Sequence, residues 1–131
     1  MNFEDWIKDI EEETDKIHVM MEQSLPDAPE QLADELRQTE AWHAWLTTQL
    51  AYANSYLDKA EYAESRKPEY ADETMVDRKI RMRGEVAKQR EIRNVLDGLC
   101  EAIRTRIMLG MSLLKASAGE RIANATIEKT F

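Results

Sequence analysis

Cysteine, proline, glycine and histidine are all scarce in this sequence. It contains one cysteine, three prolines, four glycines and two histidines among 131 residues. The single cysteine, Cys100, cannot form an internal disulfide, which is typical of a protein that works in a reducing compartment. Because few prolines and glycines interrupt the backbone, the composition favours long helices.

The sequence also lacks a long hydrophobic run. Its longest uncharged apolar stretch covers residues 107–114 and is too short to span a bilayer. Glu4, Asp5 and Asp9 occupy the place where a secretory signal peptide would carry basic residues. We therefore expect a soluble, cytoplasmic protein that makes no membrane contact.

Motifs that would indicate a reaction are missing as well. We find neither a glycine-rich phosphate loop nor a cysteine–histidine metal spacing. Cys100 lies on an apolar helical stripe between Leu96 and Ile103, which indicates a core residue more simply than a nucleophile. We therefore expect no enzymatic activity and no cofactor.

Glu40 and His43 form a Glu-x-x-His spacing, and Asp15 and His18 repeat it with aspartate. Di-iron helical bundles use this spacing on two helices, with a further glutamate on each of two others. The sequence offers only two histidines, and no glutamate stands out on the core stripe of the third predicted helix. A hydrogen-bonded core or interface histidine is the simpler interpretation, so we predict no metal site.

The charge is sorted along the chain. Residues 1–77 hold 20 acidic and 6 basic side chains, whereas residues 78–131 hold 6 acidic and 12 basic ones. The total is a net charge of −8. Because like charges repel one another, such segregation opposes compaction. It is useful when one surface must meet a polyanion, or a complementary copy of the chain, and another surface must not.

Apolar residues recur at three- and four-residue spacing through most of the chain, a pattern typical of amphipathic helices. Asn2, Asp27 and Thr74 are predicted N-caps, and Gly119 is a predicted C-cap. We therefore expect a single all-α domain over residues 1–131. Its predicted parts are helices at about 3–23, 28–66 and 75–118 and a C-terminal tail at 119–131.

These ranges predict a long antiparallel helical hairpin with a shorter N-terminal helix packed on it. The apolar stripes of the two long helices are wider than one partner helix can cover, so we expect an oligomeric bundle or ring. The residues predicted for the interface between subunits are Trp42, Trp45, Leu46, Leu50, Ile103, Ile107 and Leu114.

A run of cations occupies the first half of the third predicted helix. One hypothesis is an electrostatic track for a phosphate backbone, with tyrosines as stacking faces for unpaired bases. The other is that these cations face acidic helices within or between subunits. The cations are Arg78, Lys79, Arg81, Arg83, Lys88, Arg90 and Arg93, and the tyrosines are Tyr52, Tyr56, Tyr62 and Tyr70.

Over residues 25–120 the layout resembles the UvsY family of phage recombination mediators. A long helix ends in a tyrosine-rich stretch with Tyr52, Tyr56 and Tyr62, and a polar acidic loop follows. The second long helix then ends in an apolar stretch that contains the segment Ala102–Arg106, which is similar to a segment of that family.

The resemblance implies a phage protein of the infected bacterial cytoplasm that forms a ring, binds single-stranded DNA and helps to load a recombinase. It implies an interaction role rather than catalysis. Family members contact DNA through basic residues near the end of the first long helix, and the corresponding residues here are Lys59, Arg66 and Lys67.

The first 35 residues depart from that family, because they carry 12 acidic and only 2 basic side chains. This surface suits a basic protein partner. It also supports an alternative, an acidic inhibitor or adaptor that imitates nucleic acid, of the anti-restriction or anti-CRISPR type. A third hypothesis is a bundle that assembles only with itself. The carboxylates considered for mimicry are Asp9, Glu12, Glu13, Asp34 and Glu35.

Overall fold

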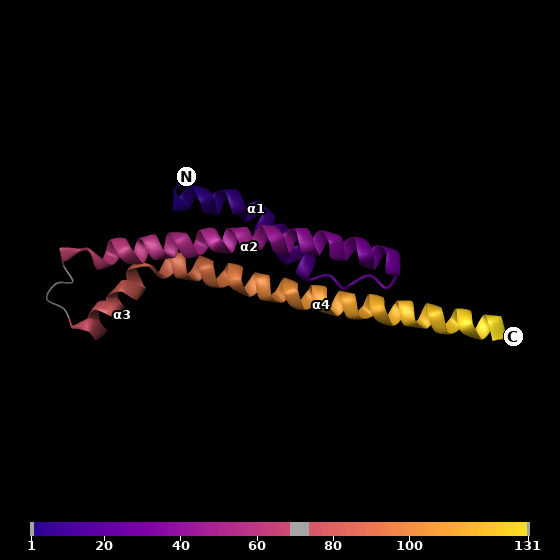
Figure 1. Cartoon of the computed structure of the whole chain (residues 1–131). Helices are drawn as coiled ribbons and strands as arrows, with labels where there is room; N and C mark the ends of the chain where they lie inside the picture. Colours follow the sequence, from indigo (N-terminus) through magenta and orange to yellow (C-terminus); the bar gives the residue numbers. More distant parts are fainter. Residues whose placement is uncertain (1, 69–73, 131) are drawn as a thin grey trace. The chain divides into compact units, whose positions relative to one another are not determined.

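The computed structural model describes residues 2–68 and 74–130, with side chains as far as Glu120. These residues are all-helical and contain no strand. The two longest helices pack against each other, which confirms the predicted all-α class and the pairing of two long helices (Figure 1). The four helices are α1 (Phe3–Met21), α2 (Pro29–Ser65), α3 (Met75–Glu85) and α4 (Ala87–Thr130).

Two of the three predicted N-caps, Asn2 and Thr74, are confirmed. The side-chain oxygen of Asn2 accepts a hydrogen bond of 2.9 Å from the backbone N–H of Asp5 at the start of α1. Thr74 accepts one of 3.2 Å from the N–H of Asp77 at the start of α3. Both caps satisfy a backbone donor that the first turn of a helix leaves unpaired.

The predicted helix at 75–118 is instead two helices. The backbone leaves helical geometry at Val86, with φ −106° and ψ 15°, two residues after Gly84. No residue of α3 is buried. Ile80, which the helical spacing placed on the core stripe, is therefore exposed.

The predicted end of the last helix is also different, because α4 continues through Gly119 to Thr130. A glycine C-cap needs a positive φ, and no glycine that the structure describes has one. Glycine inside a helix costs only about 1 kcal/mol relative to alanine, so the helix tolerates it here. The segment predicted as a tail is thus helical as far as residue 130.

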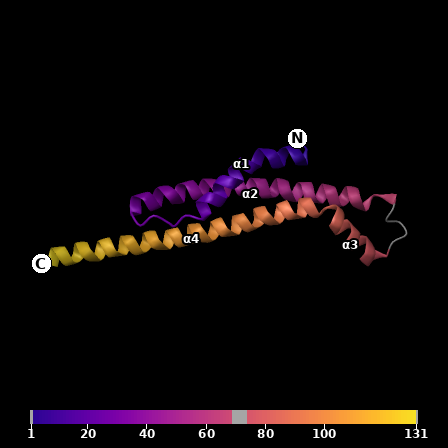
Figure 2. The same cartoon turned by 180° about the vertical axis from the view of Figure 1, so that it is seen from behind.

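Contacts between residues divide the chain into two compact units. Unit 1 comprises Met1–Ala44 and Glu101–Phe131, and unit 2 comprises Trp45–Cys100. Each unit contains part of α2 and part of α4, and within each unit these parts lie side by side in both views (Figures 1 and 2).

In unit 1 the helices α2 and α4 run antiparallel and approach closely at a glycine. Pro29 and Ala33 near the start of α2 lie beside Leu114 and Ala118 of α4. One turn further along α2, Leu36 packs directly on Gly110, and a Cβ built at position 110 would lie 3.1 Å from the Cγ of Leu36. Because Leu36 and Gly110 are both buried, this contact allows little room for a larger side chain.

The close approach predicts opposite effects for two glycine substitutions in α4. Gly98→Ala adds a methyl group with no atom within 4 Å, and it should raise the free energy of unfolding by about 0.5–1 kcal/mol through helix propensity. Gly110→Ala should lower it by up to about 2 kcal/mol, because overpacking outweighs that gain. Denaturant titration followed by circular dichroism measures both, and equal stabilisation by the two variants would contradict the close contact.

A buried arginine joins three segments of unit 1. Arg106 of α4 is 9% exposed. Its guanidinium donates one hydrogen bond of 2.8 Å to the carbonyl oxygen of Gln23, in the turn after α1. It donates another of 3.0 Å to the Glu35 carboxylate of α2. The pair Arg106–Glu35 is therefore a shielded ion pair that fixes the turn and α2 against α4.

Removal of Arg106 should be far more destructive than removal of its neighbour Arg104. Arg106→Ala leaves Glu35 without its partner in a half-buried position and should lower the free energy of unfolding by about 2–4 kcal/mol. Arg104 forms an exposed pair with Glu101, so Arg104→Ala should cost less than about 1 kcal/mol. Urea denaturation of both variants tests this difference. Similar losses in the free energy of unfolding would show that the Arg106–Glu35 pair contributes no more than an exposed ion pair.

Candidate nucleic-acid interface

Every basic residue predicted to contact nucleic acid lies in unit 2. Unit 2 holds ten acidic and ten basic side chains, so the net charge of −8 belongs to unit 1. Within unit 2, residues 78–93 carry seven basic and two acidic side chains. We call residues 78–93, which cover most of α3 and the start of α4, the basic segment.

The cations of α3 are accessible because α3 buries none of its residues. Lys79, Arg81 and Arg83 are exposed, and Arg78 is half-buried. Arg78 and Arg81 each take part in a polar or electrostatic interaction. Among the residues that the structure describes, Lys79 and Arg83 have no ion pair. These two side chains are therefore the most readily available to an anion.

Two hollows adjoin these cations. One of about 170 Å³ is lined by Lys79, Arg83 and Arg90, together with Glu61, Met82 and Val86. A second, open hollow of about 560 Å³ also includes Arg83 and Arg90, where α3 meets α4. Its other lining residues are Ala87, Glu91, Asn94 and Val95. The break at Val86 thus turns Arg83 and Arg90 toward shared concave surfaces.

Part of the basic charge is neutralised by the chain itself, as one hypothesis from the sequence predicts. Arg90 of α4 pairs with Glu61 of α2 at 3.3 Å. Lys67 pairs with Glu64 at 2.8 Å. These two carboxylates come from the tyrosine-rich end of α2, so the internal pairing is local to unit 2.

The other predicted cations have various surroundings. Lys59, at the end of α2, is exposed and has no ion pair within the described part of the chain. Lys88 is exposed and takes part in an interaction. Arg93 is half-buried and donates a hydrogen bond of 2.9 Å to the side chain of Asn94. None of these contacts buries a cation completely, so all three side chains can still be reached from solvent.

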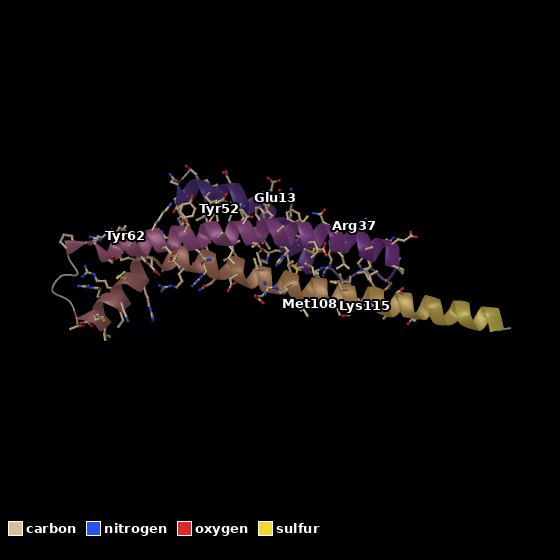
Figure 3. The ribbon with its side chains drawn as sticks, in the orientation of Figure 1. Glu13, Arg37, Tyr52, Tyr62, Met108 and Lys115 are labelled. Carbon is tan, nitrogen blue, oxygen red and sulfur yellow. The ribbon has the colours of Figure 1, made fainter. Side chains whose placement is uncertain are left out.

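An exposed aromatic face lies close to the predicted DNA contacts at the end of α2. Tyr62 is 62% exposed, and the guanidinium of Arg66 sits 4.9 Å from its ring centroid. Tyr52 is also exposed (Figure 3), and Tyr56 is half-buried. Tyr70 lies outside the described residues. Because Arg66 lies over one face of the Tyr62 ring, the other face is the one on which an unpaired base can stack.

The acidic face of α1 belongs to unit 1. Its exposed carboxylates include Asp9 and Glu12. Lys16 donates a hydrogen bond to Glu13, and this bond together with the charges of Glu13 and Glu12 raises the pKa of Lys16 above its usual 10.5. The raised pKa of Lys16 therefore reflects its contacts with two neighbouring carboxylates, first Glu13 and then Glu12.

The row of carboxylates that the mimicry hypothesis needs is interrupted. Glu35 is half-buried, and its carboxylate forms an ion pair with Arg106. Asp34 pairs with Arg37, and Glu13 pairs with Lys16. Because partners neutralise these charges or enclose them, α1 and the start of α2 do not offer one continuous line of free carboxylates.

The predicted subunit interface needs correction. Leu46 and Ile103 are 0% exposed within the single chain, so they form its own core and no second copy can cover them. The spacing identified them correctly as apolar contact positions but could not distinguish a contact within the chain from one between chains. The remaining predicted residues are half-buried: Trp42, Trp45, Leu50, Ile107 and Leu114.

The Glu40–His43 spacing does not form a metal site in the described residues. Glu40 is exposed while His43 is half-buried and makes an interaction of its own. No group of three or more histidine, cysteine, aspartate or glutamate side chains converges anywhere in the described part of the chain. Cys100 is buried, in agreement with its predicted place in the core.

Across residues 2–68 and 74–130, no helix combines the length and the apolarity needed to cross a bilayer.

No known family model matches the chain, and neither does any curated protein or any solved structure. Its function is therefore inferred from its side chains.

Proposed function

We propose that the chain is a non-enzymatic, oligomeric accessory protein that binds single-stranded DNA through the basic segment, in the manner of the UvsY-type recombination mediators that it resembles. The observation that carries the proposal is the exposure of α3, whose cations Lys79 and Arg83 lack internal ion pairs in the described residues. An unburied helix with four cations contributes little to the core. A role in binding therefore accounts for the composition of α3 better than a role in stabilising the fold does.

Two kinds of contact support a single strand as the ligand. Lys79 and Arg83 border the smaller hollow of unit 2, where they can neutralise backbone phosphates and release counterions. Tyr62 offers an exposed ring to a base, and only an unpaired base has a free face to stack on it. Arg90 can exchange its contact with Glu61 for a phosphate, because that ion pair is only partly shielded.

The acidic face of α1 fits a second role in the same process. The surface that carries Asp9 and Glu12 repels DNA. It suits a basic protein partner, such as a recombinase or another DNA-processing protein. The alternative of a nucleic-acid mimic uses the same face but predicts no DNA binding at all. A DNA-binding measurement therefore separates the two proposals.

Substitution of both unpaired cations should weaken binding and reduce its salt dependence. For a fluorescent oligonucleotide in an anisotropy titration, Lys79→Ala/Arg83→Ala should raise the Kd at least about tenfold at low salt. The slope of log K against log salt should fall by about 1.4, the value for two lost phosphate contacts to a single strand.

The matched control is Lys8→Ala/Arg37→Ala, which removes two exposed cations from unit 1 and should leave the slope unchanged. Absence of binding by the unmodified chain at low salt would defeat the proposal and favour the mimic. Equal losses in both double variants would indicate an unspecific charge effect.

Tyr62 provides an independent test of base stacking. Tyr62→Ala should weaken binding of a single strand by about five- to hundredfold, whereas Tyr62→Phe should retain most of the affinity because it keeps the ring. The ring is exposed, so thermal unfolding should shift little in either variant. A duplex of the same sequence should respond to neither substitution, and a similar loss for both substitutions would contradict stacking.

A further inference from the structure

Outside its core stripe, the part of α4 in unit 1 exposes large apolar side chains at positions where solvent-facing residues of a helix are normally charged. Residues 107–114 contain no charge. Four large side chains there remain exposed: Met108 by 63%, Leu109 by 54%, Met111 by 49% and Leu113 by 43%. We call Met108 and Met111, which lie within about 60° of each other around the helix, the outer face of α4. A helix that is apolar on all sides is normally buried on all sides, so this face is typical of an interface.

Charged residues border the outer face in a symmetric order. Glu101, Met108 and Lys115 follow one another at intervals of seven residues, so they lie on one line along the helix. Met108 is midway between a negative and a positive side chain, and both of these are exposed. Figure 3 shows Met108 and Lys115 on the side of α4 that faces away from α2.

We propose that a second copy of this chain covers the outer face of α4, in an antiparallel pairing with Met108 on the two-fold axis. In this arrangement each Glu101 meets Lys115 of the other copy, and Met108 packs on its own equivalent. A parallel pairing would instead place Glu101 beside Glu101 and Lys115 beside Lys115, and like charges oppose it. A closed two-fold pairing is also the commonest form of self-assembly.

The neighbouring side chains fit this pairing. The antiparallel register places Met111 against Thr105 of the other copy and Arg104 against Ser112, so each larger side chain faces a smaller one. Arg104 already holds Glu101 at 2.8 Å, and Glu101 can accept from Lys115 of the second copy through its other oxygen. Lys115 itself has no ion pair in the part of the chain that the structure describes.

A charge exchange tests the register directly. In analytical ultracentrifugation, the unmodified chain should sediment with twice the 15.2 kDa mass of one copy. Glu101→Lys and Lys115→Glu should each raise the dimer Kd roughly three- to tenfold, because each removes two equivalent ion pairs. The double variant E101K/K115E should restore the original Kd, and Lys8→Glu on α1 should leave it unchanged.

Cysteine substitution tests the position of the axis. Met108→Cys should form a disulfide between copies under mild oxidation, because the axis brings this position next to itself. Leu113→Cys is the matched control: it is also exposed, but its two copies would be separated by ten residues of helix, about 15 Å. Cys100 is buried and does not compete.

A single-copy mass at all concentrations would overturn the proposal. A dimer that the double variant does not restore, or that forms disulfides equally well at positions 108 and 113, would overturn it as well. These measurements contain no DNA, so their outcome is independent of whether the basic segment binds a single strand.

Discussion

Each helix of this protein can bury only the stripe of side chains that faces a neighbouring helix, and the remaining structure depends on that limit. Leu36 and Gly110 meet on the facing sides of α2 and α4, and Arg106 adds a shielded ion pair beside them. These contacts fix the two helices in unit 1 but use a minority of their surfaces. The composition of the other faces is therefore set by requirements other than folding.

Charge is also distributed unevenly between the two units. Unit 2 is neutral in total, yet its basic segment concentrates seven cations, of which Arg90 is paired with Glu61. The excess negative charge belongs to unit 1, where α1 carries it on exposed carboxylates. Because opposite charges are displayed by different units, one chain can attract a nucleic acid and a basic protein with separate surfaces.

Local features of the fold were predictable from the sequence, because they depend on neighbouring residues. The caps at Asn2 and Thr74 and the approximate extent of α2 follow from side chains within a few positions of one another. The break at Val86 was not predicted, because the helical spacing continues across it and Gly84 is a weak signal on its own. That break is what exposes Ile80 and separates α3 from α4.

Contacts between residues far apart in the sequence could not be predicted from the sequence pattern. Arg106 is bound by Glu35, 71 residues away, and no local pattern names such a partner. Its position between Ile103 and Gly110 on the core face was nevertheless a usable sign that it is buried. Leu46 and Ile103 show the converse limit, since apolar spacing predicts that a residue is covered without revealing which chain covers it.

The central claim is that the basic segment of unit 2 receives a single strand of DNA. Amide ¹H–¹⁵N spectra recorded during titration with a short oligonucleotide locate the contact residue by residue. The account predicts shifts concentrated in residues 78–93 and around Tyr62, with α1 unaffected. Shifts confined to α1, or no shifts at low salt, would contradict it.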